Sequence, residues 1–304
     1  MARLLLLLIL ITSAVEASTP LHVFVSIPPQ KALIESIGGN AVQVESLVRP
    51  GFSPHGYEPT PGQMARLAKA DLYFGIGLPL ETAWMKRIRA VNEDISFLDL
   101  SGGIAHRPLD GHASAEPEHQ DPPTAQGQSA PSHHHHDASE LDPHLWTSPP
   151  LVKQMGIGIA ASLERLAPQH KAAFATGLAG FEADLDQLDR DIRKILGGLE
   201  HRRFLVFHPS WGYFAETYGL EQIAIEHQGK EPGPRSLARL IDRAKRDGIR
   251  VVFAQPQFSR KSAEKIAHAI GGRVVLADNL APDYFENLRQ FAREVAATEV
   301  PAKP

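Results

Sequence analysis

Residues 168–198 read PQHKAAFATGLAGFEADLDQLDRDIRKILGG. Apolar side chains recur in this stretch at alternating steps of four and three, at Phe174, Leu178, Phe181, Leu185, Leu188, Ile192 and Ile195. The spacing predicts a helix with one narrow apolar stripe, which begins at Pro168 and is ended by Gly197 and Gly198. At 1.5 Å per residue this helix would be roughly 45 Å long, more than one small domain requires. We expect a strut that joins two domains; the alternative is a long surface helix of the second domain.

The chain before this helix alternates short apolar strands with helices. Strands are expected at residues 21–27, 42–48, 72–75 and 95–100. Helices are expected at residues 30–37, 61–70, 80–91 and 149–166. At the second of these, Thr60, Pro61 and Gln63 have the spacing of a capping box. The alternation predicts a parallel sheet covered on both faces.

The chain after the long helix repeats the pattern. Strands are expected at residues 204–207, 222–225, 251–254 and 274–277, and helices at 209–217, 236–246, 260–270 and 284–296. The predicted fold class is therefore α/β, with two parallel-sheet lobes joined by a long rigid helix. We expect an N-terminal lobe at 18–148, connecting helices at 149–199 and a C-terminal lobe at 200–304, in keeping with 304 residues.

The N-terminus has the pattern of a secretory signal. Arg3 precedes an apolar run from Leu4 to Ile11, and small residues follow up to Ala17. This predicts a signal peptide at 1–17, too short to span a membrane, with an uncleaved anchor as the alternative. The chain has no cysteine, which excludes disulfides, thiolate zinc sites and lipid attachment through cysteine. We expect a periplasmic monomer without a lipid anchor and without stable membrane insertion.

The charge of the chain indicates whether nucleic acid is an expected partner. The net charge is −4, and Lys and Arg are scattered without forming a stripe. Nucleic acid is therefore not an expected partner.

A histidine-rich segment at about residues 105–140 interrupts the alternation. Residues 101–141 hold five prolines and seven histidines, with almost no large apolar side chain after Leu109. The composition predicts a mobile loop. Neutral imidazole is a good ligand for zinc, copper, nickel and iron, so the loop is a candidate auxiliary metal site. The candidates are His112, His119, His133, His134, His135 and His136. A solvated tract or a cloning remnant is the alternative, although the mid-chain position argues against a tag.

Four further polar residues lie beyond the ends of predicted strands. His208 and Asp278 come directly after two strands of the second half, while His55 and His144 lie in loops after strands of the first half. Ligands of open α/β sheets bind beyond the carboxyl ends of the strands. If the two sheets face each other, three imidazoles and one carboxylate converge, a donor set suited to a divalent transition metal and to zinc above all.

Each of these candidates also has a structural interpretation. His55 and His144 can be surface turn residues, and His208 can cap the following helix. Asp283 competes with Asp278 for the carboxylate role, but its spacing to Glu286 already explains it as a helix cap. Tyr57, Trp146, Trp211 and Tyr213 lie near the candidates in sequence and can be either core residues or the walls of a dry cleft.

The motifs around these residues carry a resemblance that covers nearly all of the mature chain. They are GFSPHGYEPTPGQMARLAKADLYFGIGLPLE (51–81), DPHLWTSP (142–149), FHPSWGYFAETYGL (207–220), EHQGKEPGPRSLARLI (226–241), VFAQPQFSRKSAEKIA (252–267) and LADNL (276–280). Together they resemble the metal-binding solute-binding proteins of bacterial ABC importers, the ZnuA/TroA-like family.

The resemblance implies two lobes on a rigid helix with a metal between them, held by His55, His144, His208 and Asp278. It also implies zinc, because zinc members carry histidine-rich insertions and manganese carriers tend to have a carboxylate in place of His208. Two departures are the absence of a disulfide and Gln255 where many relatives have Glu. Neither departure involves a proposed ligand.

The predicted function is a periplasmic protein that captures Zn²⁺ and delivers it to an ABC transporter permease at the inner membrane, without catalysis. A manganese or iron carrier is the alternative within the family. A zinc hydrolase is the alternative from another class, since three histidines and an open position can activate water. A zinc buffer that never meets a transporter is a third possibility.

Overall fold

The computed structural model describes residues 19–109, 141–226 and 230–298. The expected signal segment and the six candidate histidines of the loop lie outside these residues. Over the described ranges, no helix is both long enough and apolar enough to cross a membrane.

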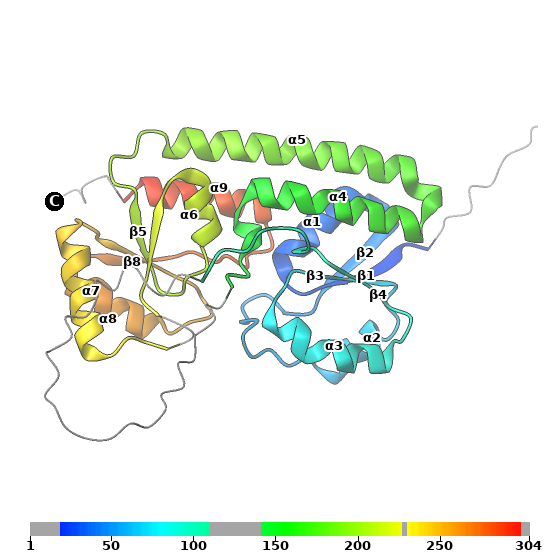
Figure 1. The fold of residues 1–304 in the computed structure, drawn as a ribbon, viewed down its shortest axis with the longest axis horizontal. Helices are drawn as coiled ribbons and strands as arrows, with labels where there is room; N and C mark the ends of the chain where they lie inside the picture. Colours follow the sequence, from blue (N-terminus) through cyan, green and yellow to red (C-terminus); the bar gives the residue numbers. More distant parts are fainter. Residues whose placement is uncertain (1–18, 110–140, 227–229, 299–304) are drawn as a thin grey trace, which may run out of the picture.

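The N-terminal lobe is built on a parallel sheet with the strand order β2-β1-β3-β4 (Figure 1). Its strands are β1 (Leu21–Val25), β2 (Val42–Ser46), β3 (Leu72–Gly75) and β4 (Ser96–Asp99). Its helices are α1 (Pro28–Gly38), α2 (Pro61–Leu67) and α3 (Pro79–Val91), with a 3₁₀ turn at Gly39–Ala41. Every residue of β3 is buried, as expected for a parallel strand covered on both faces.

The C-terminal lobe repeats this topology with the order β6-β5-β7-β8. Its strands are β5 (Arg203–Val206), β6 (Glu221–Ala224), β7 (Val251–Ala254) and β8 (Arg273–Leu276). Its helices are α6 (Gly212–Tyr218), α7 (Pro234–Arg246), α8 (Arg260–Ala269) and α9 (Tyr284–Ala296). In both lobes the strand order reverses between the first and third strands, which is where open α/β sheets bind ligands.

One long helix runs along both lobes. The helix α4 (Pro149–Leu166) and a 3₁₀ turn (Pro168–His170) lead into α5 (Lys171–Leu196), which has 26 residues. Most of its apolar stripe is buried, with Leu178 and Ile195 half-buried. The helix packs on α1 and α4 at one end and on α9 at the other (Figure 1). The predicted strut is confirmed, and the alternative of a surface helix of the second domain alone is wrong.

The contact between α5 and α1 is unusually close because α5 has glycine there. A Cβ atom at Gly177 would lie 2.2 Å from the carbonyl oxygen of Ile37, at the end of α1. The absence of a side chain at this position therefore allows the strut to lie directly on the N-terminal lobe.

Several predicted helix boundaries were wrong by two or three residues. Helix α1 begins at Pro28 and α7 at Pro234, because proline is well suited to the first helical position. Helix α6 begins at Gly212 and not at Pro209. The carbonyl oxygen of His208 accepts bonds from the Ser210 backbone and the Gln255 side chain, and the chain bends at residues 207–209 before α6 begins.

The capping box predicted at α2 is complete, whereas at α9 only the Asp283 half of the predicted capping box is present. The hydroxyl of Thr60 accepts from the backbone of Gln63, whose side chain accepts from Thr60 in return. The carboxylate of Asp283 accepts from the backbone N–H of Glu286.

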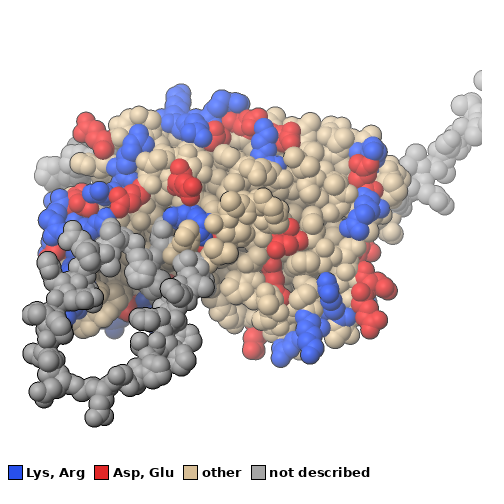
Figure 2. Space-filling view, viewed as in Figure 1, with Lys and Arg blue, Asp and Glu red and all other residues tan. Residues whose placement is uncertain are grey.

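Basic and acidic side chains are interspersed over the face of the molecule drawn in Figure 2.

Candidate metal centre

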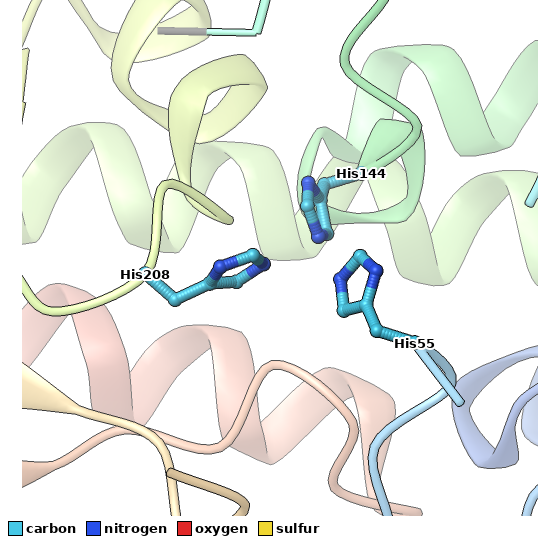
Figure 3. A group of neighbouring side chains, drawn as sticks. All are labelled: His55, His144 and His208. Carbon is cyan, nitrogen blue, oxygen red and sulfur yellow. The ribbon is translucent and has the colours of Figure 1, made fainter. Parts of the chain in front are cut away.

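Three histidines from three separate segments point toward one another (Figure 3). His55 lies in the loop between β2 and α2, His144 precedes a 3₁₀ turn (Leu145–Thr147), and His208 follows β5. One ring nitrogen of each lies within 4.8 Å of the other two. The site thus takes donors from both lobes, at the edges where the sequence predicted them.

The imidazole of His144 is fixed by a carboxylate from its own turn. Its Nδ1 lies 2.7 Å from Oδ1 of Asp142, which also accepts from the His144 backbone N–H at 3.0 Å. Both side chains are buried. Because a carboxylate accepts hydrogen bonds, Nδ1 carries the proton and Nε2 keeps its lone pair for a ligand.

The imidazole of His208 is held in the same way from a different strand end. Its Nδ1 lies 2.7 Å from Oε1 of Glu226, just beyond β6. The ring stacks on Phe258, with centroids 4.7 Å apart and planes 23° apart. Its Nε2 is buried and has no hydrogen-bond partner among the described residues. A buried acceptor of this kind is costly without a partner, so the geometry is prepared for a cation.

Burial also sets the protonation state of this ring. Desolvation lowers the pKa of His208 below its ordinary value, and the hydrogen bond to Glu226 offsets only part of that effect. A lowered pKa keeps the imidazole neutral at neutral pH, and the neutral form is the one that binds metals.

The cavity at the site is small. Besides the three histidines it is lined by Ser53, Pro54, Trp146, Gln257, Phe258, Asn279 and Leu280. The volume of the cavity is about 10 Å³. That is close to the minimum for one water molecule, so the site suits a single ion and not an organic solute.

Asp278 lies beside this cluster but does not belong to it. No fourth ligand atom joins the three histidines among the described residues. The Oδ1 atom of Asp278 accepts from the side chain of Gln257 at 2.9 Å and from the backbone of Leu280 at 3.0 Å. Its role as a ligand stays a proposal.

The carboxylates that orient the rings were missed from the sequence. Asp142 and Glu226 both stood in motifs noted for the resemblance, but neither was given a role. Asp142 precedes His144 by two residues, a spacing that local turn chemistry allows for. Glu226 is 18 residues from His208, and only the parallel pairing of β5 with β6 brings them together.

The four aromatic residues near the candidate ligands were expected to be either core residues or walls of a cleft, and the structure contains both kinds. Trp146 lines the cavity, and its indole N–H donates to the carbonyl oxygen of Asn279 at 2.7 Å. Trp211 is a core residue, stacked on Phe291 with centroids 3.6 Å apart. Tyr57 and Tyr213 are buried but do not line the cavity.

Comparison with known proteins agrees with this arrangement. The chain has the two lobes, long helix and inter-lobe histidine site of a metal-binding solute-binding protein, and residues 23–298 match the family model described as zinc-uptake complex component A, periplasmic. The chain therefore belongs to this family, which confirms the resemblance noted in the sequence.

Individual relatives are similar over most of the chain. The high-affinity zinc uptake system protein ZnuA of Yersinia pestis is 30% identical over 78% of this chain and 76% of its own length. The corresponding protein of Paracoccus denitrificans is 32% identical over 75% of this chain and 72% of its own length.

Solved structures give the same result. A crystal structure of ZnuA is 38% identical, with a TM-score of 0.81, and covers 92% of this chain and 99% of its own. A deletion mutant of ZnuA with zinc bound has a TM-score of 0.82 at 38% identity and covers 94% and 100% of the two chains. The family and the zinc-bound structure support Zn²⁺ as the bound ligand.

Proposed function

We propose that this chain is a periplasmic high-affinity zinc-binding protein that captures Zn²⁺ in the inter-lobe site and delivers it to an ABC permease at the inner membrane. The proposal includes a cleaved signal peptide at 1–17, no lipid anchor, a monomeric state and no catalytic activity. The observation that supports it best is the group of His55, His144 and His208, two of them buried with their Nδ1 atoms paired to carboxylates.

The donor set favours zinc over manganese. Zinc accepts four ligands at about 2.0–2.2 Å and binds imidazole well, whereas manganese prefers carboxylates and water. Three imidazoles are available here. We propose Asp278 as the fourth ligand, reached by a rotation that gives up its bond to Gln257. His55 is exposed on a loop, so we expect the small movements that complete the coordination of the zinc ion to occur at this residue.

The six loop histidines remain a proposal for weaker auxiliary binding. A set of clustered imidazoles can raise the local zinc concentration without contributing to the tight site.

Two measurements test the proposed function. A competition titration at neutral pH with Mn²⁺ in large excess should leave Zn²⁺ bound; displacement at comparable concentrations would identify a manganese carrier. Zinc uptake by a strain lacking this protein should fall at low external zinc and return with the wild type but not with His208→Ala. Unchanged uptake would instead favour a zinc buffer.

A further inference from the structure

A fully buried carboxylate stands behind the ligand His144. The side chain of Asp142 has no exposed surface, and its Oδ1 is used by the ring and the backbone of His144. A buried carboxylate is stable only when its other oxygen is also satisfied. The position of His144 therefore depends on what binds Oδ2.

Arg107 binds that oxygen. Its Nη1 donates to Oδ2 of Asp142 at 3.1 Å, and the backbones of the two residues are also joined, the Asp142 N–H donating to the Arg107 carbonyl at 2.9 Å. The adjacent pair, Pro108 and Leu141, forms an antiparallel bridge. Arg107 and Asp142 are 35 residues apart in sequence and meet only through this pairing.

The same arginine contacts the other lobe. Its Nε lies 3.3 Å from Oε2 of Glu216 on α6. The hydroxyl of Tyr213, also on α6, accepts from the Arg107 N–H at 3.1 Å and donates to the Asp142 carbonyl at 2.9 Å. Burial raises the pKa of Tyr213 to about 12, so the hydroxyl keeps the proton that it donates.

Glycine at the start of α6 makes room for the guanidinium. A Cβ atom at Gly212 would lie 1.5 Å from Nη1 of Arg107 and 2.8 Å from Oδ2 of Asp142. No side chain larger than hydrogen fits while Arg107 remains paired with Asp142. The first residue of α6 is thus matched to the ion pair behind His144.

We propose that Arg107 is a positioning residue of the metal site. Its guanidinium packs against Gly212 and bonds to Asp142 and Glu216. These contacts fix the imidazole of His144 and make its orientation depend on the docking of α6. The proposal rests on the proposed function only in taking His144 as a ligand. Loss of the group bonded to a ligating imidazole costs about 10–100-fold in metal affinity, and this is the upper range for Arg107, which acts through Asp142. The contacts between Arg107 and α6 cross from one lobe to the other, so the orientation of His144 depends on how the lobes are joined.

Three variants separate positioning from general stability. Arg107→Met removes the guanidinium and keeps an unbranched stem. Arg107→Lys keeps the charge but not the bridging geometry, and Gly212→Ala displaces the guanidinium without altering it. Arg203→Met is the matched control, because Arg203 pairs with Glu221 and Asp247 on the C-terminal lobe and not with a ligand.

Two readouts are needed. Zinc affinity, measured by competition with a chromophoric chelator, should fall more than twofold and by up to about 100-fold in Arg107→Met and Gly212→Ala, less in Arg107→Lys, and not in Arg203→Met. In the metal-free protein, ¹⁵N spectra should show His144 protonated at Nδ1 in the wild type and as a mixture of tautomers in the first two variants.

The two readouts can fail separately. If the wild type binds no zinc but the tautomer changes as expected, the proposed function is wrong and the positioning role stands. A zinc affinity within twofold of the wild type in both Arg107→Met and Gly212→Ala would overturn the role of Arg107. An unchanged His144 tautomer in both variants would also overturn it. Should Gly212→Ala not fold, Arg107→Met alone decides by the same criteria.

Discussion

Nδ1 of His208 lies 2.7 Å from Oε1 of Glu226, and both side chains are buried. The bond fixes the tautomer of the ring and turns Nε2, which has no partner among the described residues, toward His55 and His144. A carboxylate behind an imidazole also raises its basicity as a ligand.

Removal of that charge should weaken zinc binding. Glu226→Gln keeps an acceptor oxygen near Nδ1 but removes the negative charge, so we expect zinc affinity to fall about tenfold or more. Glu231→Gln, an exposed change on the same lobe, is the control. Isothermal competition with a chelator measures both. Equal affinities for the two variants would show that the Glu226 charge does not act on the site.

The lowered pKa of His208 predicts a pH dependence of the metal-free protein. The unfolded chain has an ordinary imidazole pKa of about 6.5, and the folded pKa is lower because the ring is buried. Between the two pKa values the unfolded state binds more protons, so the free energy of unfolding rises with pH. The contribution of His208 to stability is therefore lost as the pH falls below about 6.5. Chemical denaturation from pH 5 to 7.5 should show this loss in the wild type and less of it in His208→Asn. Parallel curves for the two proteins would contradict the shift.

Two glycines of α5 give opposite predictions for the strut. Gly177→Ala places a methyl group against the Ile37 carbonyl, and such overpacking costs about 1–3 kcal/mol. Gly180→Ala is the control, because a Cβ there meets nothing within 4 Å, and alanine is preferred to glycine inside helices by about 1 kcal/mol. Urea denaturation should show the first variant destabilised and the second stabilised. If both were stabilised, the close approach of α5 to α1 would be incorrect.

The strut also limits how the lobes can move. Since α5 packs on α1 and α4 in one lobe and on α9 in the other, metal capture should produce small tilts and loop adjustments without a wide hinge motion. Small-angle scattering of the metal-free and zinc-loaded proteins should give nearly superimposable curves. A large change in radius of gyration on zinc binding would mean that the helix does not hold the lobes.

The sequence predicted most of the fold because the relevant patterns are local. The stripe from Phe174 to Ile195 identified α5, and alternation of strands and helices identified both sheets. Helix starts were less accurate, since α1 and α7 begin at Pro28 and Pro234, two residues before the predicted starts. The segment before α6 is bonded to the distant Gln255, whose side chain donates to the His208 carbonyl oxygen, and no local pattern includes this contact.

The site was predicted in part for the same reason. His208 closely follows a strand, and His55 and His144 lie in connections after strands, so position in the sequence indicated the edge of the sheet where they lie. The partners of these rings follow no such rule: Glu226, Phe258 and Arg107 reach the site through sheet pairing, stacking and a bridge between distant segments. The proposed fourth ligand, Asp278, is the least determined, because its carboxylate is directed to Gln257 in this structure.

Anomalous diffraction from crystals of the zinc-loaded protein, recorded on both sides of the zinc absorption edge, shows directly whether zinc binds between the three histidines. We expect one strong peak within about 2.0–2.2 Å of a nitrogen from each of His55, His144 and His208, and its loss in His208→Ala but not in His268→Ala. A zinc peak elsewhere in the described protein, with none between the three histidines, would mean that these residues are not the zinc ligands.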